Sequence, residues 1–287
     1  GTVNKGPLGM DLSGDGFVTR LTSDGANLIY SGFIGGIDLD IIMALHVEVN
    51  GEVLVGGTTT SNDLPTTPGS FMPKGPIHTS AFNGFVSRIS SDGSNILWST
   101  YIGGGAVDNV IGLKVRPDGN LVLLGGTGSR DFPVTPGAFQ VQYGSSSRLS
   151  TCFLSIMDSA GTHLKASTFL GGSSMERPYS LAICNNGDIV VGGRVASVDF
   201  PATAGAYSTI KKSMGYTTSE PGSGFLVRMN GNLSKVIWGT YFDGSEAESI
   251  KGIVLGPNEE IYATGITHSL DYPVTPGAHF RVYGDQW

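Results

Sequence analysis

The stretch Gly84-Phe85-Val86-Ser87-Arg88-Ile89 decides the fold, because it recurs along the chain at a nearly fixed interval. Related phrases surround Phe17, Phe153 and Phe225, so successive copies are 68, 68 and 72 residues apart. A second phrase, Ser-x-Asp-x-Pro-x-Thr-(Pro/Ala)-Gly, repeats with the same spacings and contains Asp63, Asp131, Asp199 and Asp271. Self-similarity of this length is typical of repeat architectures. The four extra residues of the last interval lie between Gly205 and Phe225, where the polar run from Lys211 to Gly215 predicts a loop insertion.

Each repeat predicts four short strands, because apolar runs of four to eight residues alternate with turn signals and no window carries a helical apolar stripe. In the second copy we expect strands at 85–90, 96–102, 110–115 and 120–125. Asp-Gly or Asn-Gly pairs mark hairpin turns, at Asp24, Asn50, Asp92, Asp118 and Asn186. The sequence therefore predicts an all-β fold, a β-propeller of four-stranded blades in one domain covering residues 1–287.

Longer phrases of the repeat resemble a known family. Trp98-Ser99-Thr100-Tyr101-Ile102-Gly103-Gly104, Pro117-Asp118-Gly119-Asn120-Leu121 and the run from Asp131 to Phe139 are similar to the SBBP-type bacterial β-propeller repeat, in four copies that cover nearly the whole chain. The resemblance implies the propeller fold and a large secreted or cell-surface protein, extracellular or periplasmic, with no common chemistry. Three departures affect single turns, namely Ala204, Asp243 and Glu259.

The order of strands within a blade follows from one position after each Gly-Gly pair. A small residue there, Ala44, Gly112, Ser180 or Gly252, suits the crowding near a central axis, so we assign that run to the innermost strand. The chain then starts with the two outer strands of one blade and ends with its two inner strands. We expect a ring of four blades, closed by pairing of residues 17–21 with 260–267, which would bring Gly1 close to Trp287. The alternative is a longer propeller or tandem array.

Composition excludes several classes of protein. Glycine contributes 44 of 287 residues and charged residues 14%, without a strict Gly-X-Y period, which argues against disordered, coiled-coil and collagen-like chains. A net charge of −7 with 17 Lys and Arg gives no basic surface for nucleic acid. No stretch approaches 18 continuous apolar residues, so we expect no membrane span, and any secretion signal lies outside this sequence.

An acidic residue stands five positions after the first residue of each Gly-Gly position, and the four are Asp40, Asp108, Glu176 and Glu248. Around a central axis they would form a carboxylate ring at the mouth of the channel, where like charges recruit a cation such as Ca²⁺ or a polar ligand. Alternatively, each carboxylate accepts hydrogen bonds from the backbone of its glycine turn. We favour the second interpretation, because a structural role is needed once per blade.

The remaining polar positions also favour structural roles. We expect Asp63 and its equivalents to cap turns, next to a proline that fixes φ and a glycine that supplies a positive φ. Arg20, Arg88 and Arg228 recur in the third strand, where a packed stem with a solvated head is expected. The five histidines are scattered and match no metal or hydrolase motif. Cys152 and Cys184 fall at opposite ends of their blades, so both thiols should be free.

These features predict a non-catalytic binding or scaffolding module for a protein partner or a glycan, without a cofactor other than a possible Ca²⁺. The alternative is a glycan-cleaving enzyme that uses paired carboxylates at the channel mouth. Contacts should concentrate in the variable segments 71–84, 139–151 and 207–224 and near the four acids, away from the turns at Asp92-Gly93 and Asp118-Gly119. Aromatic candidates for sugar contacts in these loops are Phe71, Phe82, Tyr143, Tyr207, Tyr216 and Tyr283.

Overall fold

The computed structural model of the protein describes residues 14–76, 82–144, 150–213 and 222–279. Within these ranges the regular elements are sixteen β-strands, and there is no helix. The strands are β1 (Gly16–Leu21), β2 (Leu28–Ile34), β3 (Asp40–Val47), β4 (Val53–Thr59), β5 (Asn83–Ile89), β6 (Ile96–Ile102), β7 (Asp108–Val115), β8 (Leu121–Thr127), β9 (Thr151–Met157), β10 (Leu164–Leu170), β11 (Glu176–Ile183), β12 (Ile189–Val195), β13 (Ser223–Met229), β14 (Val236–Phe242), β15 (Glu248–Leu255) and β16 (Ile261–Thr267).

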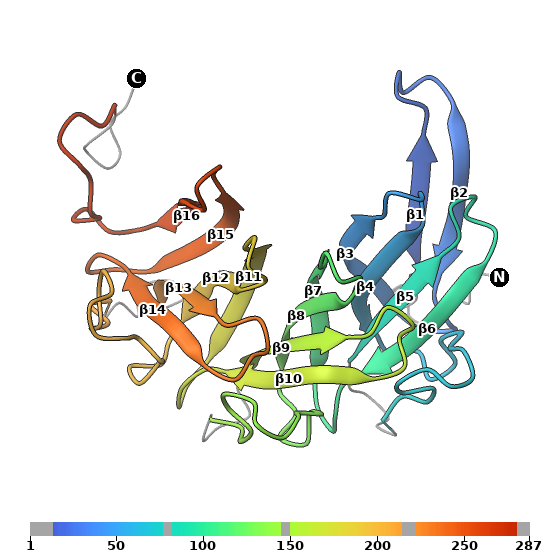
Figure 1. Ribbon diagram of the computed structural model, residues 1–287, viewed down its shortest axis with the longest axis horizontal. Coiled ribbons are helices and arrows are strands. Elements are labelled where there is room, and N and C mark those ends of the chain that lie inside the picture. The colour runs from blue at the N-terminus through green and yellow to red at the C-terminus, as the bar shows by residue number, and fades with distance from the viewer. Residues whose placement is uncertain (1–13, 77–81, 145–149, 214–221, 280–287) are drawn as a thin grey trace, which may run out of the picture. The chain divides into compact units, whose positions relative to one another are not determined.

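The strands form three complete four-stranded blades and two half-blades (Figure 1). The complete blades have the orders β3-β4-β5-β6, β7-β8-β9-β10 and β11-β12-β13-β14, and the half-blades are β1-β2 and β15-β16. In the registers described for β3–β6 and β11–β14, neighbouring strands run antiparallel. The predicted all-β class and the four-stranded repeat unit are confirmed. Ring closure into a propeller stays a prediction.

Strand boundaries agree with the repeat to within two residues. In the second copy, β6 spans the predicted range, whereas β5 and β7 each begin two residues earlier than predicted. The earlier start of β7 places Asp108 inside the strand, paired with Thr127 of β8. The acidic residue of each repeat is therefore the first residue of an inner strand and part of its hydrogen-bonded ladder.

Turn glycines adopt the backbone conformation that the Asp-Gly signals predict. Gly93 and Gly119 have φ of 73° and 79°, in the left-handed region that other residues avoid. Two copies depart from glycine and keep the conformation, because Leu233 and Glu259 have φ of 59° and 64°. A residue with a side chain costs about 1–2 kcal/mol there. Glu259 therefore leaves the turn geometry of the fourth copy unchanged.

The described chain divides into two compact units. The first contains Gly1–Thr135 and Phe153–Ser167, and the second contains Pro136–Cys152 and Thr168–Trp287. In the first unit β7 contacts β3, β4 and β5 of the preceding blade, and in the second unit β15 contacts β11, β12 and β13. Neighbouring blades within each unit therefore meet along the strand that carries the small residue.

The core of each unit lies between neighbouring blades. The second strands of the complete blades, β4, β8 and β12, are buried at every residue, and each has a strand on both edges. The first unit's core joins Val53, Val55 and Phe85 of one blade with Val18 and Ile34 of the β1-β2 hairpin. In the second unit, Ile250 and Ile253 of β15 pack on Val190 and Leu226.

Candidate functional site

The four predicted acids occupy equivalent positions and are buried. Each begins an inner strand, β3, β7, β11 or β15, and each is at most 3% exposed: Asp40, Asp108, Glu176 and Glu248. Their backbone N–H groups bind the end of the preceding variable segment in three repeats, since Asp108, Glu176 and Glu248 donate to the carbonyls of Phe82, Ser150 and Gly222. The acids therefore lie next to the ends of the variable loops, as predicted, but their side chains are buried and not exposed at the surface.

Hydrogen bonds engage the acid of the second repeat from two directions. Oδ2 of Asp108 accepts the backbone N–H of Gly104 and the hydroxyl of Ser129, both at 2.8 Å. Asp40 accepts the equivalent pair of bonds, from Gly36 at 2.8 Å and from Ser61 at 2.9 Å. The carboxylate thus ties the glycine turn to the Ser-x-Asp loop, which is the structural arrangement that the sequence favours.

The two glutamates reach the same partners with one more methylene. Glu176 accepts the hydroxyls of Ser197 and, at 3.1 Å, Thr151. Glu248 accepts the hydroxyls of Ser269 and, at 2.8 Å, Thr267. The serine belongs to the Ser-x-Asp phrase in both cases, so the two repeated motifs of the sequence are parts of one network.

Burial raises the pKa of these carboxyl groups, and the hydrogen bonds that they accept oppose the shift. The pKa of Asp108 rises to about 6 and that of Glu176 to about 7. Burial also raises the pKa of Asp40 and Glu248. Near neutral pH the charged forms are therefore held at a cost, and the free energy of folding depends on pH through these groups.

The Gly-Gly pair exists because two carboxylates press against it. A Cβ on Gly103 would lie 2.6 Å from Oδ2 of Asp108, and a Cβ on Gly104 would lie 2.5 Å from Oδ1 of Asp131. The first glycine makes room for the strand acid and the second for the acid of the Ser-x-Asp loop. Close approach, and not a positive φ, explains both glycines.

The aspartates of the Ser-x-Asp loops cap the connection that leads into the inner strand. Asp63 accepts the N–H of Ile37 at 3.0 Å, and Asp131 accepts that of Gly105 at 2.8 Å. The capping role predicted for these aspartates is confirmed. The capped segment is the neighbouring connection, 26 residues before the aspartate.

The fourth repeat breaks the pattern by placing Asp243 where the others have a glycine. Asp243 is buried and accepts the N–H groups of Lys212 and Ser213 at 2.8 and 3.2 Å and the hydroxyl of Ser223 at 2.5 Å. The start of the four-residue insertion therefore folds onto this carboxylate. Burial lowers the pKa of the adjacent Lys211, while the charges of Asp243 and Glu248 oppose the shift.

The variable loops run along the outer strand of each blade. Thr67 donates its N–H to Ser99 of β6, Gln140 to the hydroxyl of Thr168 in β10, and Thr203 to Gly239 of β14. These bonds cover the free edge of the outermost strand. The aromatic candidates at the start of the loops thus lie at the rim of the blades, whereas Phe82 lies beside Asp108. Tyr216 and Tyr283 lie outside the described residues, as do Gly1 and Trp287.

Among the aromatic candidates, Tyr207 lines a cavity of about 480 Å³ on the outer strand β14. Tyr207 stacks on Phe242, with ring centroids 5.0 Å apart, and Trp238 lies in the same wall. Phe71 is half-buried, and Tyr143 packs edge-on against Phe169 at 5.6 Å. Among the described residues, the aromatic candidates therefore do not gather into one binding surface within either unit.

The recurrent arginine heads are bound, and the prediction of solvated heads is wrong for Arg88 and Arg228. Arg88 forms ion pairs with Glu48 and Glu52 and donates to the carbonyl of Ser159. Arg228 pairs with Asp188 and Glu259. An acid directly before the second strand recurs together with an arginine in the third strand, as in Glu52 with Arg88 and Asp188 with Arg228. This recurrence was the signal that sequence reasoning missed. Cys152 and Cys184 are buried free thiols, as predicted.

No three His, Cys, Asp or Glu side chains in the described ranges converge to hold a metal ion. No helix long and apolar enough to cross a membrane occurs among the same residues.

Comparisons with known proteins give similarity of structure only at a low level. No family model and no curated protein matches the chain. A crystal structure of a protein of unknown function from Dyadobacter fermentans DSM 18053 is similar over 82% of this chain, with a TM-score of 0.42 and 13% identity. The chain spans 58% of the length of that protein. A glucose dehydrogenase structure is similar over 86% of both chains, with a TM-score of 0.35 and 12% identity.

Proposed function

We propose that the chain is a non-catalytic binding or scaffolding module, a β-propeller of the SBBP-type whose variable loops present contacts to a protein partner or a glycan. The observation that carries the proposal is the fate of the repeated acids. All four carboxylates accept hydrogen bonds from the glycine turn or from Ser and Thr hydroxyls. The repeated acids thus hold the blades together, and the longest segments that differ between repeats are the loops 71–84, 139–151 and 207–224. The resemblance supports a secreted or cell-surface setting.

Binding can be tested at the two ends of the blades. We expect a glycan or protein ligand found by screening immobilised protein to lose affinity when Phe82 or Tyr143 is changed to alanine. An Asn50→Ala variant at the opposite end serves as the matched control. Retained binding in the loop variants together with loss in Asn50→Ala would reject the loop face. Circular dichroism and thermal unfolding of every variant separate loss of contact from loss of fold.

We further propose that the two half-blades close a ring of four blades. The registers of the complete blades transfer directly: Ser87 faces Val55 and Val227 faces Val191, so Thr19 would face Ala263. Charges support the same pairing. Arg88 and Arg228 pair with Glu52 and Asp188, the equivalent position beside Arg20 is Glu260, and the copy without the arginine, at Ile156, has Asn120 there.

Closure predicts a disulfide between engineered cysteines at positions 19 and 263. The Thr19→Cys/Ala263→Cys variant should oxidise within the monomer, because facing residues of antiparallel strands have Cα atoms within the reach of a disulfide. The native thiols are buried and the control Thr19→Cys alone should stay reduced. Cross-linking only between two copies, or none, would reject closure within one chain.

The fourth repeat offers the observation that favours an enzyme instead. Asp243 and Glu248 are two buried carboxyl groups whose charges both act on Lys211, and the described residues of the other repeats have no counterpart to that lysine. Glycoside cleavage needs two carboxyl groups flanking the sugar. Hydrolysis of soluble polysaccharides that disappears in both Glu248→Gln and Asp243→Asn, with unchanged folding, would establish this alternative. We favour binding, because Asp243 is already occupied by three hydrogen bonds.

A further inference from the structure

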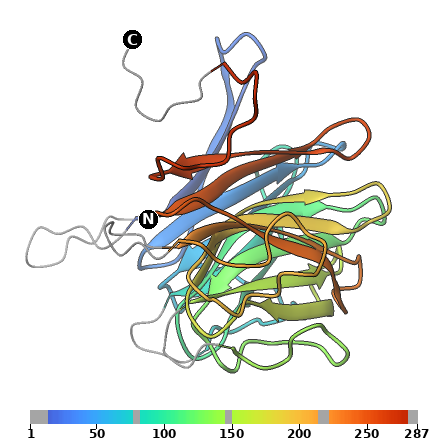
Figure 2. The ribbon, with the colours of Figure 1, turned by 90° about the vertical axis from the view of Figure 1, so that its left-hand side faces the viewer.

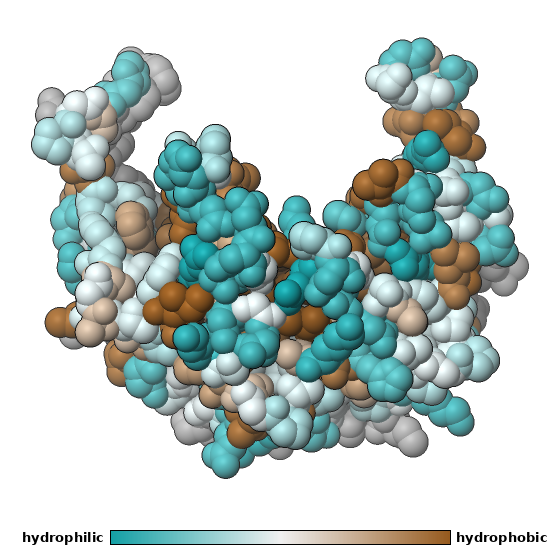
Figure 3. All heavy atoms as spheres, in the orientation of Figure 1, coloured by the Kyte–Doolittle hydropathy of each residue, from teal (hydrophilic) through white to brown (hydrophobic). Residues whose placement is uncertain are grey.

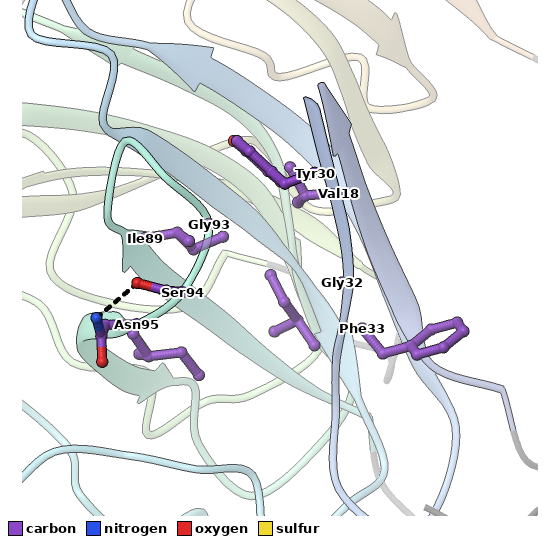
Figure 4. A pocket seen from close by; sticks show the side chains of 10 residues that line it. Val18, Tyr30, Gly32, Phe33, Ile89, Gly93, Ser94 and Asn95 are labelled. Atoms are coloured by element: carbon purple, nitrogen blue, oxygen red, sulfur yellow. Dashed lines mark hydrogen bonds between the residues drawn. The ribbon is translucent and has the colours of Figure 1, made fainter. Parts of the chain in front are cut away.

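Two contacts between neighbouring blades in the first unit use the same device, a turn glycine seated on an aromatic ring of the outermost strand. Gly93, in the turn between β5 and β6, faces Tyr30 of β2 so closely that a Cβ would lie 2.5 Å from the ring (Figure 4). Gly161, in the turn between β9 and β10, faces Trp98 of β6, and a Cβ there would collide with the indole. The turn of each blade thus covers the outer aromatic residue of the blade before it.

Hydrogen bonds fix the turn in this seat. Nε1 of Trp98 donates to the carbonyl of Ser159 at 3.0 Å, and Arg88 donates to the same carbonyl at 3.1 Å. The N–H of Phe71 donates to the carbonyl of Gly161 at 2.8 Å. An arginine, an aromatic residue and the first loop residue therefore recognise one Ser-x-Gly turn by its backbone. Arg20 makes the equivalent bond, to Ser91, at 3.1 Å.

In one repeat the large and small residues change places: the strand position has a small residue and the turn position a large one. The strand position of Tyr30 and Trp98 is Ala166 in β10, and the turn position of Gly93 and Gly161 is Leu233 in the fourth copy. Leu233 is fully buried, has φ of 59°, and its carbonyl accepts the N–H of Phe139 at 2.8 Å. The copy with alanine at the strand position therefore carries a large side chain at the turn position, even though the backbone conformation of the turn favours glycine.

The remaining aromatic residue of the series is Trp238, and the remaining turn glycine is Gly25. Neither of them makes such a contact within the part of the chain that the structure describes. Trp238 of β14 and Tyr207 of the preceding loop line the open cavity of about 480 Å³, while a Cβ on Gly25 would meet no atom within 4 Å. Gly25 has φ of 70° and follows Ser23 and Asp24, so its turn has the geometry of the turn at Gly93. A large ring at 238 requires a glycine in the turn, and residue 25 is a glycine.

We infer that the cavity at Trp238 is the seat for this chain's own turn Thr22–Asn27, with Gly25 on the indole. By equivalence, the N–H of Tyr207 donates to the carbonyl of Gly25, and Nε1 of Trp238 and the Arg228 guanidinium donate to that of Ser23. This inference rests on the proposed ring closure and adds to it a specific recognition contact. The aromatic wall is then a blade interface and not a sugar platform.

The natural combination of Ala166 and Leu233 suggests a test, in which the same small and large residues are placed at positions 238 and 25. We expect Gly25→Leu and Trp238→Ala each to lower the Tm, and the double variant to melt higher than Gly25→Leu alone, because it recreates the Ala166 and Leu233 pair. The matched control is Gly119→Leu, at φ of 79° and also with no atom within 4 Å of a Cβ. Adding Trp238→Ala to that control should only lower the Tm. A double variant that melts no higher than Gly25→Leu alone overturns the inference.

Two further measurements distinguish the chain's own turn from a second copy of the chain or a sugar as the occupant of the cavity at Trp238. In a Trp98→Phe/Trp287→Phe background, Trp238 should be protected from acrylamide, and Gly25→Leu should at least double its quenching constant. Sedimentation should give a monomer throughout. Protection that appears only at concentrations where a dimer forms, or emission of Trp238 that shifts on adding cellohexaose, overturns docking of the chain's own turn. Cross-linking of positions 19 and 263 without coupling between 25 and 238 would leave closure standing and reject this contact alone.

Discussion

The complete blade β3–β6 and the half-blade β1-β2 contain the same repeat and differ in what covers it. Phe85 on β5 is fully buried, whereas Phe17 at the equivalent position of β1 is 66% exposed. Tyr101 on β6 is 1% exposed, and its equivalent on β2, Phe33, is 79% exposed. Hydrophobic residues of this hairpin reach the surface in the space-filling view, and Phe33 points away from the neighbouring turn (Figure 3; Figure 4).

The half-blade β15-β16 differs from the complete blades in the same sense. Tyr262 of β16 is 60% exposed, while Leu54 and Val190, at the equivalent positions of β4 and β12, are fully buried. The two strands lie side by side in both ribbon views (Figure 1; Figure 2). The difference teaches that local sequence makes a hairpin in every copy, and that burial requires the other half of the blade.

The largest expected effect tests whether the half-blade β1-β2 is buried in solution. Phe85→Ala should lower the free energy of unfolding by about 3–5 kcal/mol, because it empties a filled core position. With ring closure we expect Phe17→Ala to cost within about 1 kcal/mol of that value by the same argument. Urea unfolding of the two variants measures both. A cost for Phe17→Ala below about 0.5 kcal/mol, typical of surface positions, would contradict closure.

A smaller effect concerns the pH dependence that Glu176 adds to a complete blade. Its pKa rises from 4.5 in the unfolded chain to about 7 in the folded one. Between these values the folded state keeps a proton that the unfolded state has released, so stability falls as pH rises and the full cost is present above pH 7.

We expect Glu176→Gln to remove this pH-dependent share of the stability, roughly 3 kcal/mol across the window at 1.36 kcal/mol per pKa unit. Chemical unfolding of wild type and variant at pH 4.5, 6 and 7.5 compares the slopes. Equal slopes for the two proteins would show that Glu176 titrates normally.

Removal of a repeat acid should have a comparable or smaller effect at every pH. Asp108→Ala leaves the N–H of Gly104 and the hydroxyl of Ser129 without their acceptor, at a cost of about 1–3 kcal/mol. Asp118→Ala, at a half-exposed turn, should cost less than about 1 kcal/mol. Ligand binding, once a ligand is known, should survive Asp108→Ala in proportion to the folded fraction. Selective loss of Ca²⁺ or ligand binding in a fully folded variant would favour the interpretation of the four acids as a carboxylate ring that binds a cation or a polar ligand.

The smallest effect compares one charge pair in a complete blade with its proposed equivalent. A double-mutant cycle on Arg88 and Glu52, using methionine and glutamine, should give a coupling of about 0.5–1 kcal/mol. The same cycle on Arg20 and Glu260 should give a similar value if the half-blades pair. Thermal unfolding at low and high salt checks the electrostatic origin, and zero coupling at low salt would argue against the pairing.

The sequence by itself determined the repeat and the four strands per copy. Those features depend on residues close in the chain, such as the Asp118-Gly119 turn and the alternation around Phe85, and they were predictable to within two residues. The capping role of Asp63 was also predictable in kind, because only short polar groups suit a turn.

Tertiary structure alone decided which partners these residues meet. Gly103 and Gly104 make room for two carboxylates 5 and 27 residues away in the sequence, and Arg88 finds Glu52 across a strand pair. The aromatic residues at the start of the loops lie at the outer rim, because the loops cover strand edges, whereas Phe82 lies beside Asp108, and no local pattern predicts that difference. Propensity and alternation act over a few residues, whereas close approach, burial of charge and the seating of a turn on Tyr30 or Trp98 depend on how blades pack.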